Sequence, residues 1–179
     1  MLLKTILIVV TIAYPFLIYF GLSHLNSSFV MIALVALLMA RWLIVKQDAT
    51  RNVILVSILG MLIATYLLGS QLGLKIYPVV VNASMLVLFA ASLRMKQTVI
   101  EKLARIKEPD LPPSGVRYTR QVTYVWCVFF GLNGSVSLLT AFWASNETWL
   151  FYNGFLAYLI IGTLVVSEWL IRPLVKRKV

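Results

Sequence analysis

The sequence predicts an all-α membrane protein, a bundle of six transmembrane helices. The 179 residues are 61% apolar and have a mean hydropathy of +0.92, which lies outside the range of soluble domains. The apolar residues fall in six runs, each close to the roughly 20 residues that a helix needs to cross a bilayer. The runs show no two-residue alternation, so helices are expected and not the strands of a barrel.

A single transmembrane domain over 1–179 is expected, because almost all of the chain belongs to these runs or to short turns between them. The first run is expected to remain as an uncleaved span, because no small-x-small cleavage site follows it. The predicted spans are 5–22, 29–45, 53–70, 76–93, 122–144 and 149–171.

The Lys and Arg residues predict the orientation of the spans. With the exception of Lys75, all of them fall on one side of the predicted membrane, which carries both termini and the segment 94–121. The positive-inside rule places this side in the cytoplasm. The net charge of +10 is therefore interpreted as contact with anionic lipid headgroups, not with nucleic acid.

The segment 94–121 is the only long polar stretch and is expected to form a basic cytoplasmic loop. Within it, Arg94–Lys107 predicts an amphipathic helix that lies in the membrane interface. Pro109 ends this helix, and 110–115 is expected to be a stiff, extended linker. The apolar residues that share one face of the predicted helix are Met95, Val99, Leu103 and Ile106.

Two roles are open for this loop. It either fixes the topology and anchors the adjacent helices, or it docks an acidic partner by charge complementarity. The candidate partner-binding residues are Arg105, Lys107, Arg117 and Arg120.

Polar residues inside apolar runs are costly in hydrocarbon and need an explanation. Asn82, Asn133 and Asn153 fall in the fourth, fifth and sixth spans. They either form interhelical hydrogen bonds that fix the packing or line a ligand site. Gly131 and Gly134 lie next to Asn133 and permit close helix approach, which favours the packing role.

Glu168 is the only acid inside an apolar run. It precedes Arg172 by one helical turn, so an ion pair at the membrane interface is expected, with Arg41 at the end of the second span as the alternative partner. A proton-carrying carboxylate or a headgroup site is the alternative.

The sequence predicts no catalytic residue, no metal site and no cofactor. His24 is the only histidine, which excludes a multi-histidine metal site. Neither a Gly-rich phosphate loop nor a Gly-x-Ser-x-Gly elbow is present. An enzyme is therefore less expected than a protein that binds or carries something.

Four segments resemble a family of small bacterial inner-membrane proteins that has no established activity. They are Leu103–Pro112, Arg117–Arg120, Trp149–Gly154 and Glu168–Arg172. Members of this family are encoded among enzymes of fatty-acid-like and aryl-polyene synthesis, which use acyl carrier proteins. The resemblance implies a multi-pass protein of the bacterial inner membrane that takes part in lipid-like biosynthesis.

Two functions are therefore expected. The first is an accessory or scaffold protein for acyl-chain assembly, which recruits an acidic partner such as an acyl carrier protein through the basic loop. The alternative is a small transporter or lipid-handling protein that uses the polar residues of the fourth to sixth spans. A membrane-embedded transferase is the least expected, because few reactive groups are present.

Overall fold

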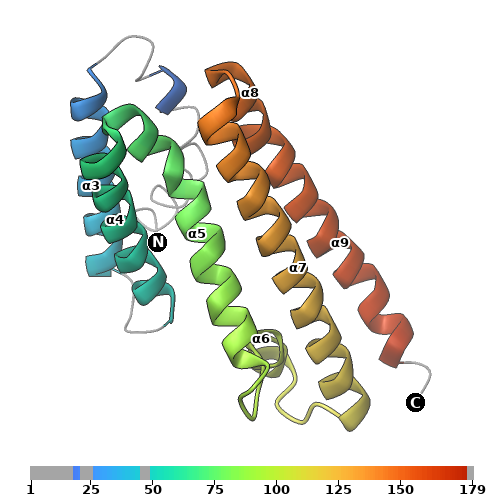
Figure 1. The fold of residues 1–179 in the computed structure, drawn as a ribbon. Coiled ribbons are helices and arrows are strands. Elements are labelled where there is room, and N and C mark those ends of the chain that lie inside the picture. The colour runs from blue at the N-terminus through green and yellow to red at the C-terminus, as the bar shows by residue number, and fades with distance from the viewer. Residues whose placement is uncertain (1–17, 21–25, 45–48, 177–179) are drawn as a thin grey trace.

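The computed structural model describes residues 18–20, 26–44 and 49–176. Every element in these ranges is a helix (Figure 1), so the all-α prediction is confirmed for the described chain. Five of the helical segments are long and apolar enough to cross a membrane. The chain is therefore a multi-pass membrane protein by helix length and composition.

The five segments overlap the second to the sixth predicted spans. The first predicted span, 5–22, lies outside the described residues except for 18–20. The last span is one continuous helical segment with a short π-helix, η1, near its start. The spanning helices are α3 (Ser27–Ile44), α4 (Ala49–Leu68), α5 (Ser70–Ser92), α7 (Pro113–Trp143), and the series α8 (Asn146–Phe151), η1 (Tyr152–Leu156) and α9 (Ala157–Lys176).

The turn between α4 and α5 is shorter than predicted, because only Gly69 separates the two helices. Its φ of 85° lies in the left-handed region that glycine adopts without strain. Close packing follows directly: a Cβ on Gly73 would lie 2.7 Å from the Cα of Thr65. The sequence prediction placed the start of this span too late because Lys75 interrupts the apolar run.

In the predicted loop 94–121, the helix expected over Arg94–Lys107 is shorter and a second helix begins, and both differences correct the prediction. A helix, α6, covers Val99–Lys107, and α7 already begins at Pro113. Proline is favourable in the first turn of a helix, where its missing N–H has no intrahelical acceptor. The expected stiff linker is therefore limited to 108–112, and Arg117 and Arg120 lie on α7 and not in a loop.

Figure 1 shows that the spanning helices alternate in direction. As a result Arg41, Arg51 and Arg172 lie at the same end of the bundle as α6, and we call this end the basic end. Helix α7 lies between α5 and α9, while α3 and α4 pack on the other side of α5. The core between α3, α4 and α5 is apolar and includes Leu38, Met61 and Leu74.

Candidate functional site

The three asparagines predicted to lie in the membrane converge on one pocket. Asn82 comes from α5, Asn133 from α7 and Asn153 from η1, and all three are buried. They line a single pocket of about 270 Å³. The sequence left open whether these residues share a cavity, and the structure brings them together.

Asn82 and Asn133 form a hydrogen-bonded pair that connects α5, α7 and η1. Nδ2 of Asn133 donates to Oδ1 of Asn82 over 3.0 Å, and the hydroxyl of Tyr152 donates to Oδ1 of Asn133 over 2.9 Å. Nδ2 of Asn82 donates to the carbonyl of Pro78 over 2.7 Å. That carbonyl lies one turn earlier on α5, so the pair is connected to the helix backbone as well.

Asn153 belongs to a second group of polar residues. Its Oδ1 accepts a hydrogen bond of 2.7 Å from the hydroxyl of Ser137 on α7. Its Nδ2 donates to Oγ1 of Thr140 over 3.3 Å and to the carbonyl of Trp149 over 3.0 Å. Both N–H bonds of Asn153 are therefore used, and this residue mainly joins η1 to α7.

Asn82 and Asn133 retain hydrogen-bonding capacity. A side-chain amide has two N–H donors and an oxygen with two lone pairs. Within the described part of the chain, each of the two residues uses one donor and one oxygen lone pair. One N–H on each buried amide is thus left over, and a buried unmatched donor is costly.

Two backbone features allow this convergence. A Cβ on Gly134 would lie 3.1 Å from the Cβ of Asn82, so the missing side chain lets α7 approach α5 closely. The π-helix η1 is a local widening of the last span and carries Tyr152 and Asn153. Such insertions are rare and occur frequently at functional sites.

The remaining walls of the pocket are apolar or aromatic. Phe129 and Phe130 of α7 form one wall, and Tyr77 and Tyr158 lie on the two flanking helices. None of the lining residues is acidic or basic. The pocket therefore combines an apolar wall with neutral amide and phenol groups, which suits an uncharged ligand that has an apolar chain and a hydrogen-bond acceptor.

Glu168 and Arg172 do not form the predicted ion pair. In the described chain the only ion pair within 4.0 Å joins Glu101 to Arg105. The backbone carbonyl of Glu168 instead accepts a long hydrogen bond of 3.4 Å from the hydroxyl of Tyr118 on α7. Both residues lie on α9 near the basic end of the bundle and do not line the pocket, so they form no common site with the asparagines.

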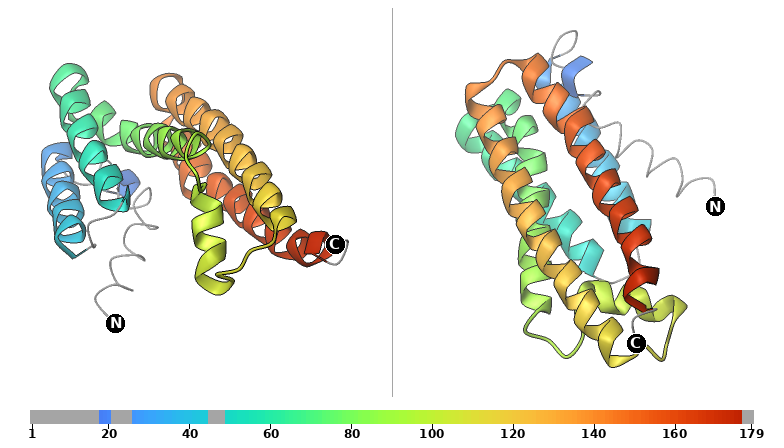
Figure 2. Two further views of the ribbon diagram at one scale, coloured as in Figure 1. Left: turned by 90° about the horizontal axis from the view of Figure 1, so that it is seen from below. Right: turned by 90° about the vertical axis from the view of Figure 1, so that its right-hand side faces the viewer.

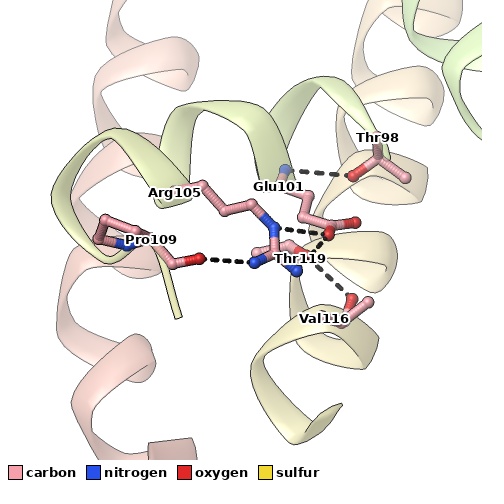
Figure 3. A network of polar contacts seen from close by, with 6 residues as sticks. All are labelled: Thr98, Glu101, Arg105, Pro109, Val116 and Thr119. Atoms are coloured by element: carbon pink, nitrogen blue, oxygen red, sulfur yellow. Dashed lines mark hydrogen bonds and ion pairs between the residues drawn. The ribbon is translucent and has the colours of Figure 1, made fainter. Parts of the chain in front are cut away.

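At the basic end, the partly exposed side chain of Arg105 is bound by other groups of the protein. Its Nη2 lies 2.9 Å from Oε1 of Glu101, whose side chain is almost fully buried, and its Nη1 donates to the carbonyl of Pro109 over 2.7 Å. Oγ1 of Thr98 accepts from the backbone N–H of Glu101 and caps the start of α6. Figure 3 shows Glu101 and Arg105 pointing from α6 toward Val116 and Thr119 in the first turns of α7.

The four predicted partner-binding residues are therefore not equivalent. Arg105 is engaged by Glu101, and Arg120 donates to the carbonyl of Leu93. Only Lys107 and Arg117 are exposed without a hydrogen bond or ion pair to the described chain. Arg105 thus binds within α6 and to the linker that follows it, and Arg120 binds the turn after α5, so both are poorly placed to form one docking surface with the other two.

Sequence reasoning missed Tyr152, Ser137 and Glu101. Glu101 was detectable, because Thr98 and Glu101 have the spacing of a capping box. Tyr152 and Ser137 gave no such signal, since a tyrosine and a serine in a span are common and their partners lie on other helices. No group of three His, Cys, Asp or Glu residues that suits a metal ion is found among the described residues.

Comparison with protein-family models, curated proteins and solved structures gives no match.

Proposed function

We propose that the protein handles a lipid-like molecule within the membrane and holds its acyl chain in the pocket between α5, α7 and α9. The observation that carries this proposal is the convergence of Asn82, Asn133 and Asn153 on one pocket with apolar walls. The resemblance of four segments to a family encoded among enzymes of fatty-acid-like synthesis would imply the same class of ligand.

The chemistry of the pocket selects the kind of ligand. The leftover N–H groups of Asn82 and Asn133 would donate to an ester or amide carbonyl of the ligand. Phe129 and Phe130 would contact its chain. A charged group is disfavoured at this depth, because the lining residues offer no opposite charge and a bilayer interior solvates charges poorly. The volume of about 270 Å³ is close to the lower end of the ~300–1,000 Å³ typical of ligand sites, which suits one chain.

Photo-crosslinking tests this proposal. The full-length protein in lipid nanodiscs is exposed to a methyl ester of a diazirine-bearing fatty acid, and adducts are mapped by mass spectrometry. We expect adducts on pocket residues such as Met85 and Ile161, well above those on the lipid-facing residues Val128 and Leu132 of α7. The pocket-filling substitution Val81→Phe should reduce the pocket adducts severalfold.

Val128→Phe is the matched control, because it adds the same volume on the lipid-facing side of α7. Asn133→Leu should abolish the preference for the ester over a hydrocarbon that carries the same diazirine. Adducts spread evenly over lipid-facing residues, or unchanged in Val81→Phe, would rule out the pocket as the binding site. Thermal unfolding of each variant separates loss of binding from loss of folding.

Recruitment of an acidic partner, such as an acyl carrier protein, is a second candidate function. It is favoured by the exposure of Lys107 and Arg117 at the basic end. A cationic surface would attract an acidic protein with modest affinity and strong salt dependence. In this function the protein is a scaffold that presents carrier-bound acyl chains to the membrane.

A binding assay with a purified acyl carrier protein tests this candidate. The double variant Lys107→Glu and Arg117→Glu should lose binding at low salt, and a double variant with Gln at both positions should show an intermediate loss. Arg105 and Arg120 stay unchanged, because reversing them would disturb α6 and α7. Equal binding by all forms, or binding that does not respond to salt, would exclude electrostatic recruitment.

For the topology we propose that the basic end faces the cytoplasm, with both termini inside, in a bacterial inner membrane. The clustering of Arg41, Arg51 and Arg172 at the end that carries α6 supports this orientation. A reporter enzyme that is active only in the cytoplasm should be active when it is fused to the C-terminus, and one that is active only in the periplasm should be inactive there. Activity of a periplasmic reporter at the same position would reverse the proposed orientation.

A further inference from the structure

Helix α6 has its polar side turned inward and its apolar side turned outward. Glu101 and Ala104 are buried against the protein, whereas the side chains of Leu103 and Ile106 are 57% and 77% exposed. A helix of a soluble protein has the reverse arrangement, with its apolar side against the core. The exposed apolar side chains of α6 therefore need another apolar environment.

The positions around α6 explain this arrangement. With 3.6 residues per turn, successive side chains are rotated by about 100°, so Val99, Leu103 and Ile106 lie roughly 140–200° from Glu101. We call these three residues the outer stripe of α6. Lys102 and Lys107 lie on either side of the stripe, at roughly 100° and 240°. Both lysines are exposed.

The direction and level of α6 agree with a position at the membrane surface. Figure 1 shows α6 end-on and the spanning helices lengthwise, so α6 runs across the bundle. Figure 2 shows it at the level of the last turn of α9, where the apolar part of that helix ends. Since Glu101 and Arg105 point toward the first turns of α7 (Figure 3), the outer stripe faces away from α7.

We propose that the outer stripe of α6 inserts into the lipid leaflet at the basic end, with Lys102 and Lys107 bound to anionic lipid phosphates. Long lysine side chains extend their ammonium groups to the headgroups while their methylene stems remain near hydrocarbon. Basic residues near an anionic membrane surface add to the attraction. The charge and the apolar surface of α6 thus fit the same partner, an anionic bilayer.

This assignment changes the role of Lys107. Lys107 contacts lipid beside the stripe, so in a membrane with anionic lipids Arg117 is the residue that remains available to an acidic protein partner. Arg105 acts from the opposite side of the helix: it pairs with Glu101 one turn earlier on α6 and neutralises this buried carboxylate, so the polar side can face α7 while the stripe faces outward.

Depth measurements by fluorescence quenching test the proposal. Single cysteines are placed at Ile106 and Arg117 in a Cys127→Ser background of the full-length protein and labelled with the same small fluorophore. The protein is reconstituted in nanodiscs of phosphatidylcholine with a minority of phosphatidylglycerol. Quenching is compared between a nitroxide-labelled lipid and aqueous iodide.

We expect the fluorophore at position 106 to be quenched strongly by the lipid nitroxide and weakly by iodide, with the reverse at position 117. The double substitution Lys102→Gln and Lys107→Gln should weaken the lipid quenching at position 106, and removal of phosphatidylglycerol should do the same. Iodide quenching at 106 equal to that at 117 would show that the stripe faces water and overturn the proposal. Protection of 106 from both quenchers would show that a protein covers the stripe, which would overturn it too.

Discussion

Asn133 on α7 donates a hydrogen bond of 3.0 Å to Asn82 on α5, and both side chains are buried. This contact joins two spanning helices that lie next to each other over most of their length. It exists because Gly134 lets the two helices approach, and it is extended by Tyr152 on the last span. A packing role and a binding role are therefore not alternatives for these asparagines, because the same amides hold the helices and line the pocket.

The coupling between Asn82 and Asn133 is measurable. We predict that Asn82→Ala and Asn133→Ala each reduce the free energy of unfolding, and that the double variant loses less than the sum. The coupling energy should be about 0.5–2 kcal/mol, the range found for interhelical hydrogen bonds in membranes. Unfolding in mixed micelles of a mild detergent and sodium dodecyl sulfate gives the four values.

Tyr152→Phe tests the second hydrogen bond of Asn133, which comes from the last span. It removes only the hydroxyl that donates to Asn133 and keeps the ring. We expect a loss of about 0.5–1.5 kcal/mol. Additive losses in the double variant, with no effect of Tyr152→Phe, would show that the amides make no stabilising contact across the helices.

Two serines of α7 provide a second prediction. Ser137 is fully buried and donates to Asn153, whereas Ser135 is exposed and bonds only to the carbonyl of Gly131 on its own helix. Ser137→Ala should cost about 1–2 kcal/mol, because Oδ1 of buried Asn153 loses its donor. Ser135→Ala should change stability by no more than about 0.5 kcal/mol. Equal effects of the two substitutions would contradict the hydrogen-bond assignment.

The sequence predicted the class of fold well, because long apolar runs depend only on local composition. It also placed Asn82, Asn133 and Asn153 inside the predicted spans. It did not predict that Asn82, Asn133 and Asn153 share a pocket, because the rotation of one helix against another depends on contacts such as Gly134 with Asn82. Helix–helix registry is a tertiary property, and a hydropathy pattern alone does not contain it.

At the basic end, the sequence shows the charges but not which of them have partners. Charge counting treated Arg105, Lys107, Arg117 and Arg120 as one group, because the sequence does not show which cations have partners. The structure separates them: Glu101 engages Arg105, the carbonyl of Leu93 engages Arg120, and the other two are exposed. The start of α7 at Pro113 was missed because two consecutive prolines are typical of extended linkers as well as of helix starts.

Close packing at Gly134 leads to a third prediction. Gly134→Ala places a Cβ 3.1 Å from the Cβ of Asn82, which is tighter than ordinary contact, so α5 and α7 must separate slightly. We expect a net destabilisation of about 1–2 kcal/mol. Gly162 in α9 has nothing within 4 Å, and Gly162→Ala should be neutral or stabilising by up to about 1 kcal/mol. Thermal unfolding in detergent compares the two, and a gain in stability for Gly134→Ala would show that the interface is loose at this point.

The ion pair between Glu101 and Arg105 leads to the last prediction. Glu101→Ala removes the partner of Arg105 from the side of α6 that faces α7, so the helix should lose its fixed orientation while the spanning bundle stays folded. The cost should be about 1.5–3 kcal/mol, as for hydrogen bonds to charged groups, and it should appear as local opening. Hydrogen exchange over 98–112 should become faster in Glu101→Ala and remain unchanged in the control Arg117→Gln, because Arg117 is exposed and lies outside α6. If the two variants exchange alike, α6 is held by its contacts with the surroundings and not by the ion pair, and the inward polar side would be a consequence of the helix position and not its cause.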